Sequence, residues 1–353
     1  MVYEKMLKPL FFSLDPEYVH DLFTSIGEKL GQSRAGRSIT SWAYDYHGDN
    51  ASVTVDGIKY RTPIILSAGF DYNARLTTIL PSLAFGGVEV GSITARPCAG
   101  NKAPRLTRLP RSRSIIVNKG LRNDGVDAII DRLQKKERIS DFVIGVSIAR
   151  TNDCETTDVE SGITDYLTSF QKLNESNVGD YYAINISCPN AFGGETFAEP
   201  ARLQLLLSAL ATVRTTKPIY IKMPINLSWT ELSALLRVIE PFKINGVIIG
   251  NLNKDYSSLK IREEAPAEYR GGLSGSPCFL PSNNLIRKTR EKYGKRFTII
   301  GTGGIFSPAD AMVKLAAGAD LVQLITGMIY RGPSLIKNIA HEYAQRKKLV
   351  AIK

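Results

Sequence analysis

The chain has 353 residues, 43% of them hydrophobic, and a formal net charge of +11. This length and apolar content suffice for a complete hydrophobic core, and α/β barrels of about 250 residues often form one domain. The four cysteines lie far apart without a CxxC pair, which argues against a zinc site, an iron–sulfur cluster or a disulfide framework and fits a reducing cytosol.

The histidines, the hydropathy and the charge bear on whether the protein binds a metal, spans a membrane or binds nucleic acid. His20, His47 and His341 are too scattered to suggest a metal site. No apolar run approaches the roughly 20 residues that span a bilayer, and no signal peptide is visible. A basic surface attracts nucleic acid, anionic lipid or small anions, and charge alone does not choose among them.

The first 31 residues predict two short amphipathic helices. Asp15 can cap a helix that has Pro16 in its first turn. Pro9 argues against one long regular helix upstream of it. Apolar side chains recur at helical spacing, at Tyr3, Met6, Leu7, Leu10 and Phe11 and again at Val19, Leu22, Phe23, Ile26 and Leu30. Such helices either pack on the domain that follows or lie in a lipid interface.

Residues 53–60 alternate around Asp56-Gly57, which predicts a tight hairpin. We expect it to plug the N-terminal end of the sheet that follows.

From Pro63 onward, short apolar runs alternate with segments of helical periodicity. Continuous apolar strands that alternate with helices indicate a parallel sheet covered on its outer face. Eight such units favour a closed (β/α)8 TIM barrel over an open sheet. The predicted strands are Pro63–Ser67, Val88–Ile93, Asp141–Ile148, Tyr181–Ser187, Pro218–Met223, Gly246–Gly250, Phe297–Gly301 and Asp320–Ile325.

A dense basic cluster lies between the second and third predicted strands. Its members are Lys102, Arg105, Arg108, Arg111, Arg113, Lys119 and Arg122. Because charge runs are usually solvated, we interpret this segment as an exposed basic loop.

The fourth predicted strand ends in a thiol between two carboxamides: Asn185, Cys188 and Asn190. Barrels present their catalytic groups at the carboxyl ends of strands. An unperturbed thiol has a pKa of about 8.5, which suits acid–base or nucleophilic chemistry. The alternative is a buried structural cysteine before a proline turn.

Glycine clusters follow the later strands, at Gly271–Gly275, Gly301–Gly304 and Gly327. Loops after strands 7 and 8, with a helix that starts near Ser307, form the phosphate site of many barrels. We therefore expect a phosphorylated cofactor. Lys222, inside the fifth strand, needs a partner for its charge, either that cofactor or a carboxylate.

Together these motifs resemble the dihydroorotate dehydrogenases, FMN-dependent barrels of pyrimidine synthesis, over nearly the whole chain. The phrases that carry the resemblance are SLDPEYVH (13–20), SAGFD (67–71), GSITARPCAGNKAPRLTRLP (91–110), INISCPN (184–190), IKMP (221–224), GGLSGSP (271–277), IIGTGGI (299–305) and LVQLITGMIYRGP (321–333).

The resemblance implies the site residues by position. FMN would contact Ala68, Gly69, Ser92, Ser147, Asn185, Lys222, Gly275, Gly303, Gly304, Ile325 and Thr326. The substrate, dihydroorotate or orotate, would meet Tyr72, Asn118, Lys119, Gly120, Leu121, Asn185, Asn190 and Asn251. Cys188 stands at the position of the base that removes a substrate proton.

Several positions depart from the family pattern. Tyr72 replaces a usual lysine, Val117 a usual asparagine, Ser147 a common FMN-contacting asparagine and Ile325 a usual tyrosine. Our hypothesis is that Lys119 restores the lost cation that pairs with the substrate carboxylate. The alternative is that Lys119 is a surface charge.

The electron acceptor is left open by the mosaic of motifs. The N-terminal helices resemble the membrane-associated, quinone-linked class, in which His20 and Arg108 would line the quinone tunnel. Cys188 resembles the soluble class, which uses fumarate or NAD. We expect quinone, with residues 1–40 as tunnel and membrane contact on the cytoplasmic side, and 41–353 as the FMN-binding barrel.

Two rival functions remain. A tRNA dihydrouridine synthase is also a basic FMN barrel with a cysteine acid, although we expect no nucleic-acid partner because little chain follows the last predicted strand. A degenerate barrel that binds FMN without turnover is suggested by Tyr72 and Val117.

Overall fold

Eight parallel strands close into a barrel in the order β3-β4-β7-β8-β9-β10-β12-β13. The structure is a computed structural model that describes residues 3–188, 190–192, 197–269 and 271–351. All eight predicted strands are confirmed, each within about two residues of the expected bounds. They are β3 (Ile64–Leu66), β4 (Gly87–Ile93), β7 (Val143–Ile148), β8 (Tyr181–Asn185), β9 (Ile219–Met223), β10 (Gly246–Ile249), β12 (Thr298–Thr302) and β13 (Leu321–Leu324).

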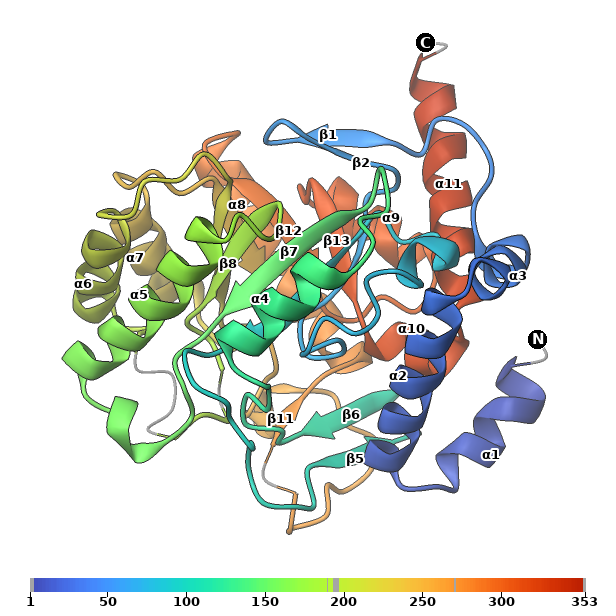
Figure 1. Cartoon of the computed structure of the whole chain (residues 1–353), viewed down its shortest axis with the longest axis horizontal. Helices are drawn as coiled ribbons and strands as arrows, with labels where there is room; N and C mark the ends of the chain where they lie inside the picture. The colour runs from blue at the N-terminus through green and yellow to red at the C-terminus, as the bar shows by residue number, and fades with distance from the viewer. Residues whose placement is uncertain (1–2, 189, 193–196, 270, 352–353) are drawn as a thin grey trace.

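Helices surround this barrel on its outer face (Figure 1). Their apolar sides pack with the outward-facing strand residues into one large core, which explains why the strands are apolar on both faces. The helices are α4 (Val126–Lys135), α5 (Val159–Glu175), α6 (Pro200–Leu210), α7 (Trp229–Ile239), α8 (Phe279–Tyr293), α9 (Pro308–Ala316), α10 (Thr326–Arg331) and α11 (Ser334–Ala351).

The predicted hairpin is β1 (Val53–Val55) and β2 (Ile58–Tyr60). Asp56 and Gly57 have φ values of 49° and 78°, as a tight two-residue turn requires. Tyr60 is fully buried in the cluster that fills the N-terminal end of the barrel, with Tyr181 and Tyr220. The expected plug is therefore confirmed.

The predicted basic loop is wrong: much of it is β-structure. β5 (Leu106–Leu109) and β6 (Ser114–Val117) pair antiparallel, and β11 (Gly272–Leu273) joins β6. Leu109 and Ile116 pack on Leu273 on one side of this small sheet, while Ile115 packs on Phe306 and Tyr330. These buried apolar contacts anchor the sheet although several basic residues lie in and beside its strands.

In the described part of the chain, three α-helices precede the barrel, one more than predicted. A π-helical turn (Tyr3–Leu7) leads into α1 (Lys8–Phe12), α2 (Pro16–Gln32) and α3 (Arg34–Tyr44). The Asp15 carboxylate accepts hydrogen bonds from the backbone N–H groups of Glu17 and Tyr18, which confirms the expected cap. The proposed boundary after residue 40 falls within α3.

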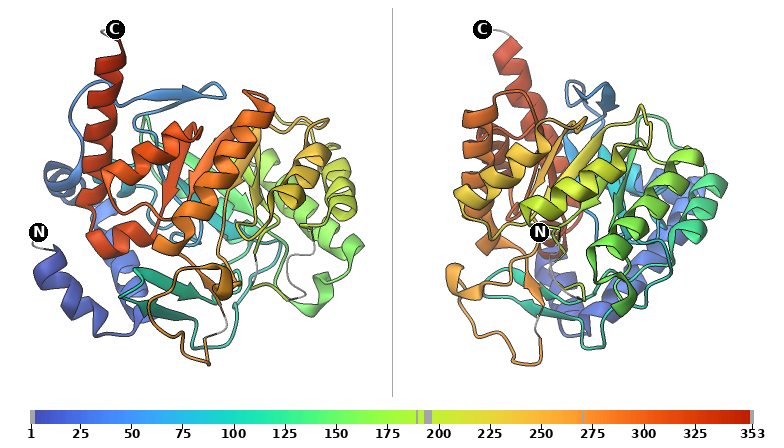
Figure 2. Two further views of the ribbon diagram at one scale, coloured as in Figure 1. Left: turned by 180° about the vertical axis from the view of Figure 1, so that it is seen from behind. Right: turned by 90° about the vertical axis from the view of Figure 1, so that its left-hand side faces the viewer.

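The two ends of the barrel carry different structures. The hairpin β1–β2 and the end of α11 lie at one end, and the β5–β6–β11 sheet lies at the other, beside α1 and α2 (Figures 1 and 2). The carboxyl ends of the parallel strands face the β5–β6–β11 sheet. The predicted site residues that follow these strands therefore lie between the barrel and this small sheet.

The barrel plug yields a matched pair of stability predictions. Tyr220 donates a hydrogen bond to Asp56 at 2.6 Å, whereas the Tyr60 hydroxyl has no hydrogen-bond partner among the described residues. We expect Tyr220→Phe to lower the free energy of unfolding by about 0.5–1.5 kcal/mol, and Tyr60→Phe to leave it unchanged or raise it. Urea unfolding followed by circular dichroism measures both. Equal destabilisation by the two variants would contradict this account.

Candidate active site

A cavity of about 580 Å³ lies at the carboxyl end of the barrel, bounded by the strand ends, the β5–β6–β11 sheet and α2. It is large enough for a small ligand together with a cofactor. Most of the predicted site residues line it. They are His20, Ala68, Gly69, Tyr72, Ser92, Arg108, Lys119, Gly120, Leu121, Asn185, Cys188, Asn190, Lys222, Asn251, Gly275, Gly303, Gly304, Ile325 and Thr326.

Two predicted residues, Ser147 and Asn118, lie behind this lining. Ser147 shares a hydrogen bond of 2.7 Å with Ser92, and Asn118 accepts one of 2.9 Å from Asn101. Both side chains therefore support a neighbour rather than face the cavity.

A buried ion pair forms the floor. Lys222 Nζ on β9 lies 3.3 Å from Glu89 Oε1 on β4, and both side chains are almost fully buried. Glu89 also accepts hydrogen bonds from Gln323 at 2.8 Å and from Tyr181 at 3.3 Å. Lys222 thus has the carboxylate partner that its burial demands and still reaches the cavity. Sequence reasoning missed Glu89, although a carboxylate inside an apolar strand was a visible signal.

A hydrogen-bonded network of neutral groups surrounds this pair. The Asn185 amide donates to Ser92 Oγ at 2.8 Å, and its carbonyl accepts from the Ser187 hydroxyl at 3.1 Å. Asn251 donates to Ser187 Oγ at 2.8 Å. Because each partner is held by another, these side chains present fixed donors and acceptors.

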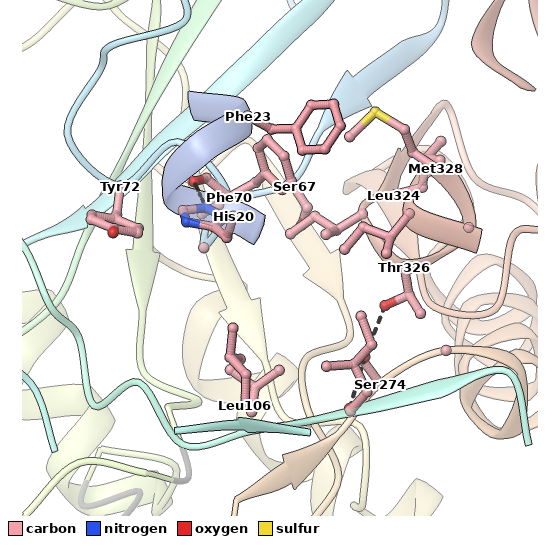
Figure 3. Close-up of a pocket in the computed structure, with 18 of the residues that line it drawn as sticks. His20, Phe23, Ser67, Phe70, Tyr72, Leu106, Ser274, Leu324, Thr326 and Met328 are labelled. Carbon is pink, nitrogen blue, oxygen red and sulfur yellow. Dashed lines mark hydrogen bonds between the residues drawn. The ribbon is translucent and has the colours of Figure 1, made fainter. Parts of the chain in front are cut away.

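The glycine-rich loops form one rim of the cavity. Gly275 and Gly304 adopt φ values of 90° and 77°. A Cβ atom at Gly275 would lie 2.3 Å from the Arg113 carbonyl oxygen, and one at Gly304 would lie 2.4 Å from Phe279 Cβ. Nearby, Ser274 and Thr326 share a hydrogen bond of 2.8 Å (Figure 3). Only glycine permits this backbone path, which leaves main-chain groups at the surface of the rim.

Cys188 follows β8 and lines the same cavity, where its side chain is partly buried. The next residue, Pro189, lies outside the described residues. The placement supports a chemical role, because a purely structural cysteine would face the core.

Lys119 is the least satisfied charge in the lining. It is 8% exposed, so the interpretation as a surface charge is wrong. Its ammonium lies 3.8 Å from Glu17 Oε1 and has no hydrogen-bond partner among the described residues. Burial lowers the pKa of Lys119 to about 8. The Oδ1 atom of Asn190 likewise has no hydrogen-bond partner in the described part of the chain. Because buried polar atoms normally have partners, this cation and this acceptor suit a ligand that supplies them.

Tyr72, at the position of the usual lysine, supplies no charge. Burial raises its pKa to about 12, so the phenol stays neutral. Its ring lies 4.9 Å from Lys119 Nζ and is stacked on His20 at 5.5 Å.

The other half of the cavity is apolar. Phe23 of α2, Phe70, Leu324 and Met328 gather in one part of the lining, and Ser274 and Thr326 lie apart from Phe23 and Phe70 (Figure 3). His20 is fixed by the Phe70 carbonyl oxygen at 2.8 Å. Arg108 donates to the Leu14 carbonyl oxygen at 2.8 Å, which ties the small sheet to the start of α2. The cavity therefore joins a charged chamber to an apolar passage beside the N-terminal helices.

Two kinds of feature are absent from the described residues. In those ranges, no helix is long and apolar enough to cross a bilayer. The same ranges contain no group of three or more histidine, cysteine or acidic side chains arranged to hold a metal ion.

Comparisons with known proteins agree with this architecture. The family model for dihydroorotate dehydrogenase matches residues 50–346. A Thermosynechococcus vestitus protein named dihydroorotate dehydrogenase (quinone) is 34% identical over 96% of this chain and 94% of its own length. A Christiangramia forsetii protein of the same name is 34% identical over 98% and 99%.

A solved structure extends the similarity to three dimensions. The Eimeria tenella dihydroorotate dehydrogenase in complex with ferulenol superposes with a TM-score of 0.81 and 26% identity, over 96% of this chain and 93% of that one. The family model and the two relatives cover nearly the whole barrel as well as the cavity. The chain belongs to the dihydroorotate dehydrogenase family.

Proposed function

We propose that the protein oxidises dihydroorotate to orotate in pyrimidine synthesis, with FMN as its cofactor and a quinone as the final acceptor. The family membership and the names of the relatives support this activity. The observation that carries it is the set of unsatisfied groups in one cavity. An ammonium and an amide oxygen without hydrogen-bond partners among the described residues belong to residues that line the same cavity as the Cys188 thiol, which suits a small anion with ring N–H groups.

Each part of the substrate has a chemical counterpart. The carboxylate would pair with Lys119, because its charge is uncompensated by a close partner. The ring N–H and C=O groups would meet the carboxamides of Asn190, Asn185 and Asn251, which donate and accept without adding charge. Gly120 and Leu121 would contribute the backbone around the anion.

The residues also fit FMN. The glycine rim at Gly275, Gly303 and Gly304, with Thr326, would hold the phosphate. Lys222, Ser92 and Asn185 would hold the polar ring edge, and Ala68 and Gly69 would cover it. When bound, FMN supplies the hydride acceptor that no side chain provides.

Cys188 would act as the general base. Removing a proton from a substrate ring carbon requires a positioned acceptor, and a thiolate forms far more readily than a serine alkoxide. The fixed network around Asn185 would keep the ring oriented toward the thiol.

The apolar passage favours quinone over fumarate or NAD, because a lipophilic acceptor needs a dry path. His20 and Arg108 would lie along it. The aliphatic side chain of Ile325 suits the same passage. Family membership in the dihydroorotate dehydrogenases leaves little support for the tRNA dihydrouridine synthase alternative.

The N-terminal helices would make peripheral contact with a membrane. Met6 and Trp42 are 70% and 81% exposed, and Leu10 and Ile39 are also exposed. Exposed apolar side chains beside lysines, such as Lys5, are typical of interfacial helices. We place this contact on the cytoplasmic side.

Replacing the proposed base tests the chemistry. We expect Cys188→Ser to slow anaerobic flavin bleaching by dihydroorotate by about 10-fold or more and to move its pH optimum upward. Stopped-flow absorbance between about pH 6 and about pH 10 measures both. Cys154→Ser, at an exposed cysteine, is the control and should match the wild type. An unchanged rate and profile for Cys188→Ser would refute the assignment, and no bleaching of the wild type would favour the degenerate barrel.

Removing the proposed anion partner tests substrate binding. We expect Lys119→Met to raise the dihydroorotate KM by about 10- to 150-fold, because a hydrogen bond to a charged group contributes about 1.5–3 kcal/mol. Steady-state kinetics at saturating quinone measures it. Lys102→Met removes an exposed lysine of the same segment and should be silent. A silent Lys119→Met would refute the compensation for Tyr72.

Membrane contact is tested by co-sedimentation with anionic phospholipid vesicles. We expect Trp42→Ser to weaken binding by about threefold to tenfold, because the indole no longer enters the interface. Leu280→Ser, at a 61% exposed leucine on α8 of the barrel, should leave binding unchanged. Equal effects of the two variants would argue against a specific contact through the N-terminal helices.

A further inference from the structure

Glu17 connects the N-terminal helices to the segment that covers the cavity. It lies in the first turn of α2, and its carboxylate is 16% exposed. Arg105 donates to Oε2 through Nε and lies 2.9 Å from Oε1 through its terminal nitrogen. Arg122 donates to Oε1 at 3.1 Å. These arginines flank the β5–β6 hairpin, so one carboxylate joins both of its ends to α2.

Lys119 completes this charge cluster. Its ammonium lies 3.8 Å from Glu17 Oε1, close enough for attraction but beyond hydrogen-bond distance. The arginines hold Glu17 in place, and Lys119 lines the cavity while its buried ammonium has no hydrogen bond to any described residue. Asp21, one turn along α2, is the other carboxylate that acts on Lys119. Three cations thus face two carboxylates, and one positive charge remains for a ligand.

We infer that Glu17 is a positioning residue for the substrate anion: it keeps Lys119 in place and charged, so that α2 forms part of the substrate site. This inference rests on the proposed pairing of Lys119 with the substrate carboxylate. Helix α2, which borders the apolar passage, would then also contribute to anion binding in the charged chamber.

The electrostatics of the cluster give the inference a measurable signature. Burial lowers the pKa of Lys119 to about 8, Glu17 and Asp21 raise it, and Arg122 and Arg105 lower it further. In the described part of the chain, the other group that faces Lys119 is the ring of Tyr72, whose phenol stays neutral. An anion binds the ammonium and not the neutral amine. Orotate affinity should therefore be full below about pH 8 and decline above it.

A merely structural role for Glu17 predicts something different. Ion pairs that are partly exposed contribute little to stability, and losing one would loosen α2 without moving a titration. The chain offers a matched control in Glu4, which pairs with Arg331 at 2.7 Å and ties the same N-terminal segment to α10. Among the described residues, the ion pair of Glu4 is with Arg331 and not with the cluster around Lys119.

The experiment measures equilibrium binding of orotate to the oxidised, FMN-loaded enzyme by calorimetry, from about pH 6.5 to about pH 9.5. We expect Glu17→Gln to move the alkaline loss of affinity downward by about 0.5–1 pH unit, because the ammonium loses its nearest counter-charge. Arg122→Gln should move it upward, because a neighbouring cation is removed. Glu4→Gln should follow the wild type, and Lys119→Arg should retain binding without the alkaline loss.

Opposite shifts in the two cluster variants cannot arise from general loosening of the helix. An unmoved profile in Glu17→Gln, or the same shift in Glu4→Gln, would overturn the inference. If Glu17→Gln does not fold, Glu17→Asp takes its place: the shorter carboxylate lies farther from the ammonium, so a downward shift supports the inference and an unmoved profile contradicts it. Wild-type enzyme that fails to bind orotate at any pH would instead refute the proposed function.

Discussion

The buried pair of Lys222 and Glu89 sets the chemistry of the barrel interior. Two opposite charges from β9 and β4 meet where water is excluded, so each must keep its partner and its hydrogen bonds. Gln323 and Tyr181 donate hydrogen bonds to the other carboxylate oxygen of Glu89. This pair fixes a cation at the floor of the cavity, and the neutral network around Asn185 can then be ordered above it. The cofactor chamber that we propose depends on this fixed charge.

The N-terminal helix α2 lies beside both the apolar part and the charged part of the cavity. Phe23 and its neighbours on α2 form the apolar passage, while Glu17 on the same helix faces the basic ends of the β5–β6 hairpin. A single helix thus borders the proposed acceptor path and also contacts Lys119, the proposed partner of the substrate anion. The substitution of Tyr72 for the usual lysine fits our proposal that Lys119 supplies the cation, because Glu17 of α2 lies 3.8 Å from the Lys119 ammonium as a counter-charge.

Much of the fold was predictable because its signals are local. Apolar runs of strand length indicated the eight strands, Asp56-Gly57 indicated the hairpin, and Asp15 indicated the cap of α2. The β5–β6–β11 sheet was missed because its strands are short and lie among arginines, and most of the partners that bury Leu109, Ile115 and Ile116 lie more than 100 positions away in the sequence. Helix α3 was missed because it packs on η2 (Leu80–Leu83) and α11, and its exposed side includes Trp42.

The candidate site likewise has features that the sequence predicted and features that only the tertiary structure decided. The sequence alone determined the kind of chemistry, because a thiol at a strand end, glycines after the last strands and a lysine inside a strand together indicate a cofactor-binding barrel. Tertiary structure decided which charges are paired. Lys222 forms a buried pair with Glu89 at 3.3 Å, whereas Lys119, which is also buried, lies 3.8 Å from Glu17 and has no hydrogen-bond partner among the described residues. Whether a buried charge has a partner depends on side chains brought together from distant segments, and spacing along the chain does not encode those distances.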